Sequence, residues 1–144
     1  MKTNIVYETI LQEAELAADA AASKWLKEAQ ARGPAFSVHE GSLFGGATGP
    51  AIGYLLDVCG NAFIKIRDAR KRFPKYLLEK KKADYVKRTG RKPYPGSIGA
   101  YWSIHHCLSG RQEMGLNIAA AEAFMSVLRK HDVADGLYVH SYID

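Results

Sequence analysis

The stretch YLLDVCGNAFIKI, residues 54–66, decides the fold class of this chain. Its two halves have the composition and the apolar–polar alternation of β-strands rather than of helices. Gly60 and Asn61 between them tolerate positive φ values, so the sequence predicts two strands joined by a tight hairpin turn. A hairpin inside a chain that also contains helical segments favours an α+β fold.

Three helices are expected around these strands. Residues 4–31 carry apolar side chains at helical spacing and are rich in alanine, which has the highest helix propensity. A second helix is expected from Pro74, a residue suited to a first helical turn, to about Arg88. A third follows Ser109, the first residue of a capping box.

Further strands are expected where apolar and polar side chains alternate, at residues 35–40, 100–107 and 137–144. The predicted order of elements is α-β-β-β-α-β-α-β. It corresponds to an α+β fold with a single mixed or antiparallel sheet of about five strands, packed by about three helices. Residues 1–144 are expected to form one domain, because a chain of this length can bury a core without disulfides or metals.

Composition indicates an ordinary globular protein, with 47% hydrophobic and 24% charged residues. Two cysteines, Cys59 and Cys107, are too few for a disulfide framework, which favours a reducing, cytoplasmic setting. Acidic residues interrupt the N-terminal apolar pattern, so no signal peptide is predicted. No apolar run approaches the roughly 20 residues that a bilayer-spanning helix needs. We therefore expect a soluble intracellular protein.

Strand alternation places three histidines on one face of the predicted sheet. His39, His105 and His140, together with Ser103 and Tyr101, are the candidates for acid–base catalysis by a small histidine-dependent enzyme. No catalytic signature and no metal-ligand spacing accompany them. We therefore assign no enzyme activity, expect no cofactor, and predict no metal site.

The same face is rich in aromatic side chains, which it is expected to bury against another surface. Its rings belong to Phe63, Tyr101, Tyr138 and Tyr142. Either the basic helix or a second copy of the chain could cover them, so the protein is a possible homo-oligomer.

A glycine-rich segment, residues 40–53, offers backbone N–H groups to a phosphate. Its candidate contacts are Gly45, Gly46, Thr48 and Gly49. The segment lacks the terminal Gly-Lys-Ser/Thr of a P-loop. It leaves a module that binds a nucleotide or a small phosphorylated ligand as an alternative function.

The most informative signal is the concentration of positive charge in residues 65–95, expected to form a basic helix and arm. From Lys65 to Lys92 there are thirteen Lys and Arg against three Asp and Glu, a local net charge of +10, whereas the whole chain carries +5. The candidate anion-binding residues are Arg70, Lys71, Arg72, Lys75, Lys81, Lys82, Lys87, Arg88, Arg91 and Lys92. Aromatic residues interleave with them, and the candidates for base stacking are Phe73, Tyr76, Tyr85 and Tyr94.

These observations predict a small basic protein that engages an anionic partner, with DNA or RNA as the leading choice. The alternatives are a nucleotide- or phosphate-binding module, with or without histidine chemistry, and a small protein that inhibits a larger complex by docking on it. No membrane partner is expected.

Overall fold

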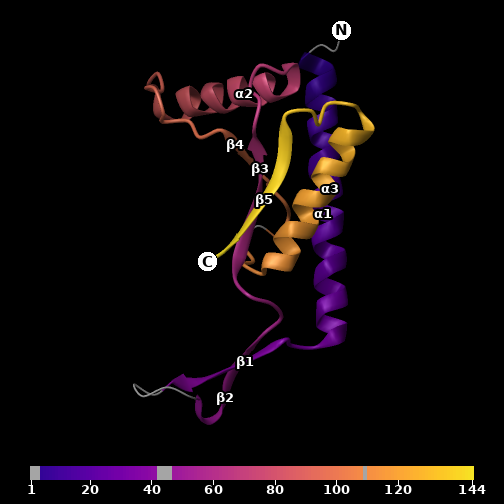
Figure 1. Ribbon diagram of the computed structural model, residues 1–144, viewed down its shortest axis with the longest axis vertical. Coiled ribbons are helices and arrows are strands. Elements are labelled where there is room, and N and C mark those ends of the chain that lie inside the picture. The colour runs from indigo at the N-terminus through magenta and orange to yellow at the C-terminus, as the bar shows by residue number, and fades with distance from the viewer. Residues whose placement is uncertain (1–3, 42–46, 109) are drawn as a thin grey trace.

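The computed structural model of the protein describes residues 4–41, 47–108 and 110–144, and these form three helices and five strands (Figure 1). The elements are α1 (Asn4–Arg32), β1 (Phe36–Gly41), β2 (Ala47–Leu55), β3 (Gly60–Ile66), α2 (Arg72–Thr89), β4 (Tyr101–Ser103), α3 (Met114–Lys130) and β5 (Leu137–Ile143). The predicted α+β class and the predicted order of helices and strands are confirmed.

The strands form two antiparallel sheets, whereas the sequence predicted one. β1 and β2 pair with each other, and the second sheet has the order β4-β3-β5, with β3 at its centre. In the described residues β2 does not pair with β3, so the hairpin predicted at Gly60-Asn61 is wrong. The hairpin of β1 and β2 instead projects from the rest of the molecule at the bottom of Figure 1.

Contacts with the start of α3 explain why no turn forms at Gly60. The Gly60 N–H donates to the Gln112 carbonyl at 2.9 Å, and the Met114 N–H donates to the Val58 carbonyl at 2.9 Å. A side chain on Gly60 would lie 2.6 Å from the Tyr142 carbonyl oxygen. The glycine is therefore needed for close packing between chain segments, not for a reversal of direction.

The helix α3 begins at Met114 and not at the predicted capping box, whose Ser109 lies outside the described residues. Its N-cap residue, Glu113, forms no side-chain capping hydrogen bond. Asp57 supplies a cap from a distant part of the chain: its Oδ2 accepts a hydrogen bond from the Gly115 N–H at 2.6 Å. A carboxylate in this place also interacts favourably with the positive end of the helix dipole.

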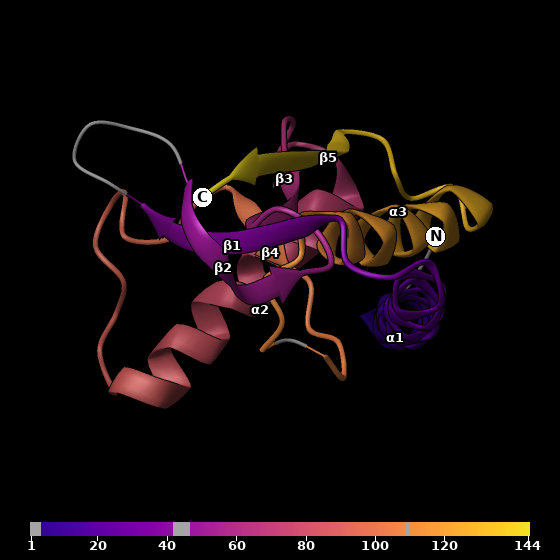
Figure 2. The same ribbon diagram turned by 90° about the horizontal axis from the view of Figure 1, so that it is seen from below.

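The core lies between the β4-β3-β5 sheet and the helices α1 and α3, which run antiparallel on one side of the sheet (Figures 1 and 2). Ile64 of the central strand and Phe124 of α3 are completely buried. Ala14, Ala18 and Ala22 are also fully buried, and these small side chains let α1 approach α3 closely. Among the described helices, none combines the length and apolar composition of a bilayer-spanning segment.

The strand β4 is shorter than predicted and ends at Ser103. Trp102 points into the core, where its indole N–H has no hydrogen-bond partner among the described residues. The chain then turns, and His106 becomes buried beside α3, with Nε2 3.2 Å from Oδ1 of Asn117. His105 stays exposed. The adjacent histidines therefore face different surroundings because of this turn and not because of strand alternation.

Three large side chains of the projecting hairpin lie outside the core. Its register places Phe36 opposite Leu55 and Ser37 opposite Tyr54, and partners of this kind share one face of a sheet. Phe36, Leu55 and Tyr54 are all exposed, with Tyr54 at 66%. These three side chains therefore add little to the buried apolar surface of the protein.

Candidate nucleic-acid interface

The basic segment forms α2, which begins at Arg72, two residues before the predicted Pro74, and ends at Thr89, next to the predicted Arg88. Phe73, Pro74 and Leu77 are buried, so the first half of the helix is attached to the protein and its second half is mostly exposed. Pro74 lies in the first turn, where a missing N–H breaks no helical hydrogen bond. Gly90 ends the helix at a φ of 69°, and its N–H donates to the Val86 carbonyl at 2.7 Å.

Two of the predicted stacking residues attach α2 to α1 and cannot stack on a ligand. The ring centroid of Tyr7 on α1 lies 5.2 Å from that of Phe73 and 5.3 Å from that of Tyr76. The Tyr76 hydroxyl donates to Oε2 of Glu8 at 2.5 Å. This prediction failed because sequence position alone does not say which side of a short helix faces the core. The other two candidates remain accessible, Tyr85 half-buried and Tyr94 71% exposed.

Two of the predicted anion-binding residues are engaged by acidic neighbours. Nε of Arg70 lies 2.9 Å from Oδ1 of Asp68, and the hydrogen bonds from this residue lower the pKa of Asp68 to about 2. Nζ of Lys71 lies 3.0 Å from Oδ2 of Asp135. Both cations would have to exchange an existing carboxylate for a phosphate, which makes them weaker candidates than their neighbours.

Lys81, a third predicted anion-binding residue, holds α2 against the strand β4. Its ammonium group donates to the carbonyl oxygens of Gly99 at 2.8 Å and of Tyr101 at 2.5 Å. The same nitrogen lies 3.8 Å from the centroid of the Tyr101 ring. Burial lowers the pKa of Lys81. This lysine is a structural contact and not a free cation.

The other seven predicted cations are exposed, and their side chains form no ion pair or hydrogen bond with any described residue. They are Arg72, Lys75, Lys82, Lys87, Arg88, Arg91 and Lys92. They lie on α2 and in the loop that follows it, the part of the molecule that extends away from α1 (Figure 1). The arrangement concentrates unneutralised positive charge on one protruding element.

One hollow lies beside this element, and a second hollow shares three lining residues with it. The first, of about 290 Å³, separates α2 from β4 and is lined by Tyr85 and Arg88 from the helix. The second is a cleft of about 650 Å³ over the sheet. Tyr101, Ser103 and His105 line both hollows, so the hollow beside the basic helix and the cleft over the sheet are neighbours.

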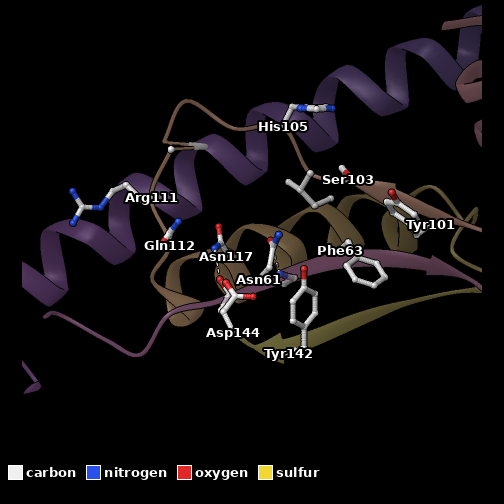
Figure 3. A pocket seen from close by; sticks show the side chains of 14 residues that line it. Asn61, Phe63, Tyr101, Ser103, His105, Arg111, Gln112, Asn117, Tyr142 and Asp144 are labelled. Atoms are coloured by element: carbon white, nitrogen blue, oxygen red, sulfur yellow. Dashed lines mark hydrogen bonds between the residues drawn. The ribbon is translucent and has the colours of Figure 1, made fainter. Parts of the chain in front are cut away.

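The cleft over the sheet has an aromatic end and a polar end (Figure 3). Phe63, Tyr101 and Tyr142 line the aromatic end. At the polar end, the Arg111 guanidinium pairs with the Glu113 carboxylate: Nε lies 3.1 Å from each carboxylate oxygen, and Nη2 donates to Oε1.

Sequence reasoning did not single out the polar end of the cleft. Asn117 lies there, and its side-chain amide donates to the Gly60 carbonyl at 2.9 Å. Asn117 itself was a signal in the sequence, since it is a single amide on the otherwise apolar face of its helix. Arg111 carries no comparable signal in the sequence.

The five candidate catalytic residues do not form one cluster. His39 belongs to the separate β1–β2 sheet, where its ring nitrogens contact Ser37 Oγ at 2.9 Å and the Gly49 carbonyl at 3.2 Å. His140 on β5 and Ser103 on β4 belong to the two strands that flank β3 in the second sheet. Their backbones are about 10 Å apart at the usual strand spacing. The predicted convergence of three histidines on one sheet face is therefore wrong.

The predicted phosphate loop is not supported as a cradle for an anion. Gly45 and Gly46 lie outside the described residues, as does the side chain of Thr48. Gly49, with a φ of 72°, is part of β2 and belongs to the projecting hairpin, away from α2 (Figure 1). Its carbonyl, not its N–H, forms the contact with His39.

Within the described residues, no group of three or more His, Cys, Asp or Glu side chains is placed to hold a metal ion. The chemistry available at this surface is thus exposed positive charge beside aromatic rings. Comparison of the chain with protein-family models, with curated proteins and with solved structures finds no match.

Proposed function

We propose that the protein binds nucleic acid, with α2 and the loop after it contacting the phosphate backbone. The observation that carries the proposal is the set of seven exposed cations of this element that have no ion-pair partner among the described residues. Lysine and arginine side chains neutralise phosphates and release condensed counterions, which drives association.

The placement of acidic groups supports this choice. Glu79 and Asp84 are the two acids of α2, and both are exposed. Other acids of the protein form internal contacts: Glu13, for example, accepts a hydrogen bond from Lys130 at 2.7 Å and lies 2.6 Å from the His131 ring. A polyanion that approaches α2 therefore meets a local excess of positive charge.

A small phosphorylated ligand in the cleft is less well supported. Among the described residues that line the cleft, Arg111 is the single Lys or Arg, and its charge is already neutralised by Glu113. Asp144 adds a negative charge to the same wall. Self-association of the chain stays a prediction, which light scattering at low and high salt would test.

Fluorescence anisotropy with labelled nucleic acid at several salt concentrations tests the proposal. The expected result is a linear fall of log affinity with log salt. The variant K82Q/K87Q/R88Q/K92Q removes four of the free cations. It is expected to bind more weakly and to lower the steepness of the salt dependence by about 3, since each lost phosphate contact contributes about 0.7–0.9.

A matched control removes the same charge elsewhere. The variant K24Q/K27Q/R32Q/R129Q loses four exposed cations of α1 and α3. It is expected to keep nearly the original affinity and salt dependence. Equal losses of affinity in the two variants would show that binding responds only to the total charge of the protein, which would contradict a specific role of α2. Absence of binding at low ionic strength would refute the proposed function.

A further inference from the structure

The open face of the β4-β3-β5 sheet carries an exposed aromatic cluster. Residues of β3 alternate, with Asn61, Phe63 and Lys65 directed away from the helices and the residues between them buried in the core. Antiparallel register places Phe63 between Ser103 of β4 and His140 of β5. The central ring of the face is therefore flanked on both sides by further strands.

Four rings gather around this position. The Phe63 centroid lies 5.2 Å from that of Tyr101, 5.2 Å from that of His140 and 6.1 Å from that of Tyr142. Tyr101 and Tyr142 nevertheless remain 42% and 43% exposed. Of α2, Lys81 lies over the Tyr101 ring, and the exposed fractions show that much of the surface of both tyrosines is still accessible.

Polar and charged groups border the rings and indicate what kind of partner fits. Lys65 lies between Tyr101 and Tyr138 in the next row of the face, and its side chain is exposed. Arg88 of α2 lines the neighbouring hollow together with Tyr101. Aromatic faces beside cations suit planar bases joined by phosphates better than they suit an apolar protein surface.

We propose that this face stacks unpaired bases, so that the ligand held by α2 is a single strand of nucleic acid. The inference rests on the proposed function and specifies its ligand. Bases inside a duplex are already stacked on one another and cannot reach the rings. An unpaired strand that crosses Tyr101, which borders both hollows, could place its phosphates along α2 and its bases over Phe63 and Tyr142.

The position of Tyr101 supports the same assignment. Lys81 lies over its ring, and a side chain on Gly99 would come within 2.3 Å of that ring. These contacts fix the Tyr101 side chain at the boundary between the basic helix and the aromatic face. A fixed ring stacks at a lower entropic cost than a freely rotating one.

The test compares a short labelled oligothymidylate, which does not pair with itself, with a hairpin duplex of the same total charge. The single strand is expected to bind more tightly. Tyr142→Ala is expected to weaken strand binding about tenfold, since one stacked ring contributes about 1–3 kcal/mol. The salt dependence should stay unchanged because no cation is removed. Tyr142→Phe, which keeps the ring, should retain the affinity.

Tyr54→Ala is the matched control, because Tyr54 is an exposed tyrosine of the separate hairpin. It is expected to leave strand binding unchanged. Stacking and phosphate contacts do not involve the sugar, so an oligodeoxyuridylate and an oligouridylate, which carry the same base, should bind comparably, and a large preference for either sugar would overturn this mode. Equal affinity for strand and duplex, with no effect of Tyr142→Ala, would overturn the inference but leave the cationic function intact. Failure of all probes to bind at low ionic strength would instead refute the function itself.

Discussion

The ammonium nitrogen of Lys81 lies 3.8 Å from the centroid of the Tyr101 ring and donates hydrogen bonds to two carbonyl groups beside it. One side chain thereby joins the basic helix to the edge of the sheet. Its neighbour Lys82 is exposed and has no ion-pair partner among the described residues. Two adjacent lysines of one helix thus have different roles, and substitutions can separate these roles.

Lys81→Met is expected to destabilise the protein by about 1 kcal/mol. It removes the donor to the Gly99 and Tyr101 carbonyls and the cation over the ring, but it also relieves the cost of burying an ammonium group. Urea unfolding measures the change. Lys82→Met is the control and should stay within about 0.5 kcal/mol of the original, as exposed substitutions usually do. Equal effects of the two substitutions would contradict the assigned contact.

Acid is expected to weaken the attachment of α2 to α1. Hydrogen bonds from Lys80 and Tyr76 hold the pKa of Glu8 below its ordinary value of 4.5. The unfolded chain therefore takes up this proton first as the pH falls. The stability contributed by the carboxylate is complete above about pH 5 and is lost as the pH falls through the lowered pKa.

Thermal unfolding at about pH 7 and about pH 3 measures this loss with and without the carboxylate. Glu8→Gln should lower stability at neutral pH by up to about 1 kcal/mol, because the pair is partly exposed, and should reduce the acid-induced loss. Glu79→Gln, at an exposed position of α2, should leave the stability at neutral pH and the acid-induced loss unchanged. An identical acid response in all three proteins would exclude Glu8 as its source.

Removal of the remote cap of α3 is expected to cost about 1 kcal/mol. Asp57→Ala takes the acceptor away from the Gly115 N–H, whereas Asp57→Asn keeps one oxygen and should lose less. Chemical denaturation gives the free energy of unfolding for both variants. The exposed Asp84 provides the comparison, and Asp84→Ala should have little effect. A stability unchanged by Asp57→Ala would mean that solvent replaces the cap at no cost.

The β1–β2 hairpin is expected to be dispensable for folding. The Ala35 N–H donates to the Leu55 carbonyl at 2.9 Å, so the two ends of the hairpin lie side by side. Replacing residues 36–54 by a short Gly-Ser linker should change the free energy of unfolding by no more than about 1 kcal/mol, because an isolated two-stranded sheet is at best marginally stable. Loss of a cooperative urea transition would show that the core depends on the hairpin.

Local sequence signals located the three helices, although not the start of α3, and they did not predict how the strands pair. Pro74 and Gly90 delimit α2 through backbone chemistry that acts within one turn. The dipeptide Gly60-Asn61 has the composition of a hairpin turn, and only hydrogen bonds to residues about fifty positions away decide that β3 begins there. Alternation within β3 and β4 nevertheless identified the aromatic face.

For the candidate site residues, too, local sequence patterns reveal one part and tertiary contacts decide the rest. The excess of positive charge in residues 65–95 is visible in the sequence, and most of these cations are exposed. Which candidate side chains, cationic or aromatic, already contact other groups of the protein depends on tertiary structure, as Lys81 and Tyr76 show. A helix attached by only part of its surface gives too weak an apolar pattern to indicate its buried side.

The buried indole of Trp102 gives the protein an internal optical reporter. The chain has two tryptophans, and Trp25 lies near the start of α3 at Gly115. The emission of Trp102 is expected at short wavelength, because its N–H faces no described hydrogen-bond partner and its ring is shielded from water. With Trp25→Phe as background, a strand that stacks on the adjacent Tyr101 would change the surroundings of Trp102 and therefore this fluorescence, without any attached dye.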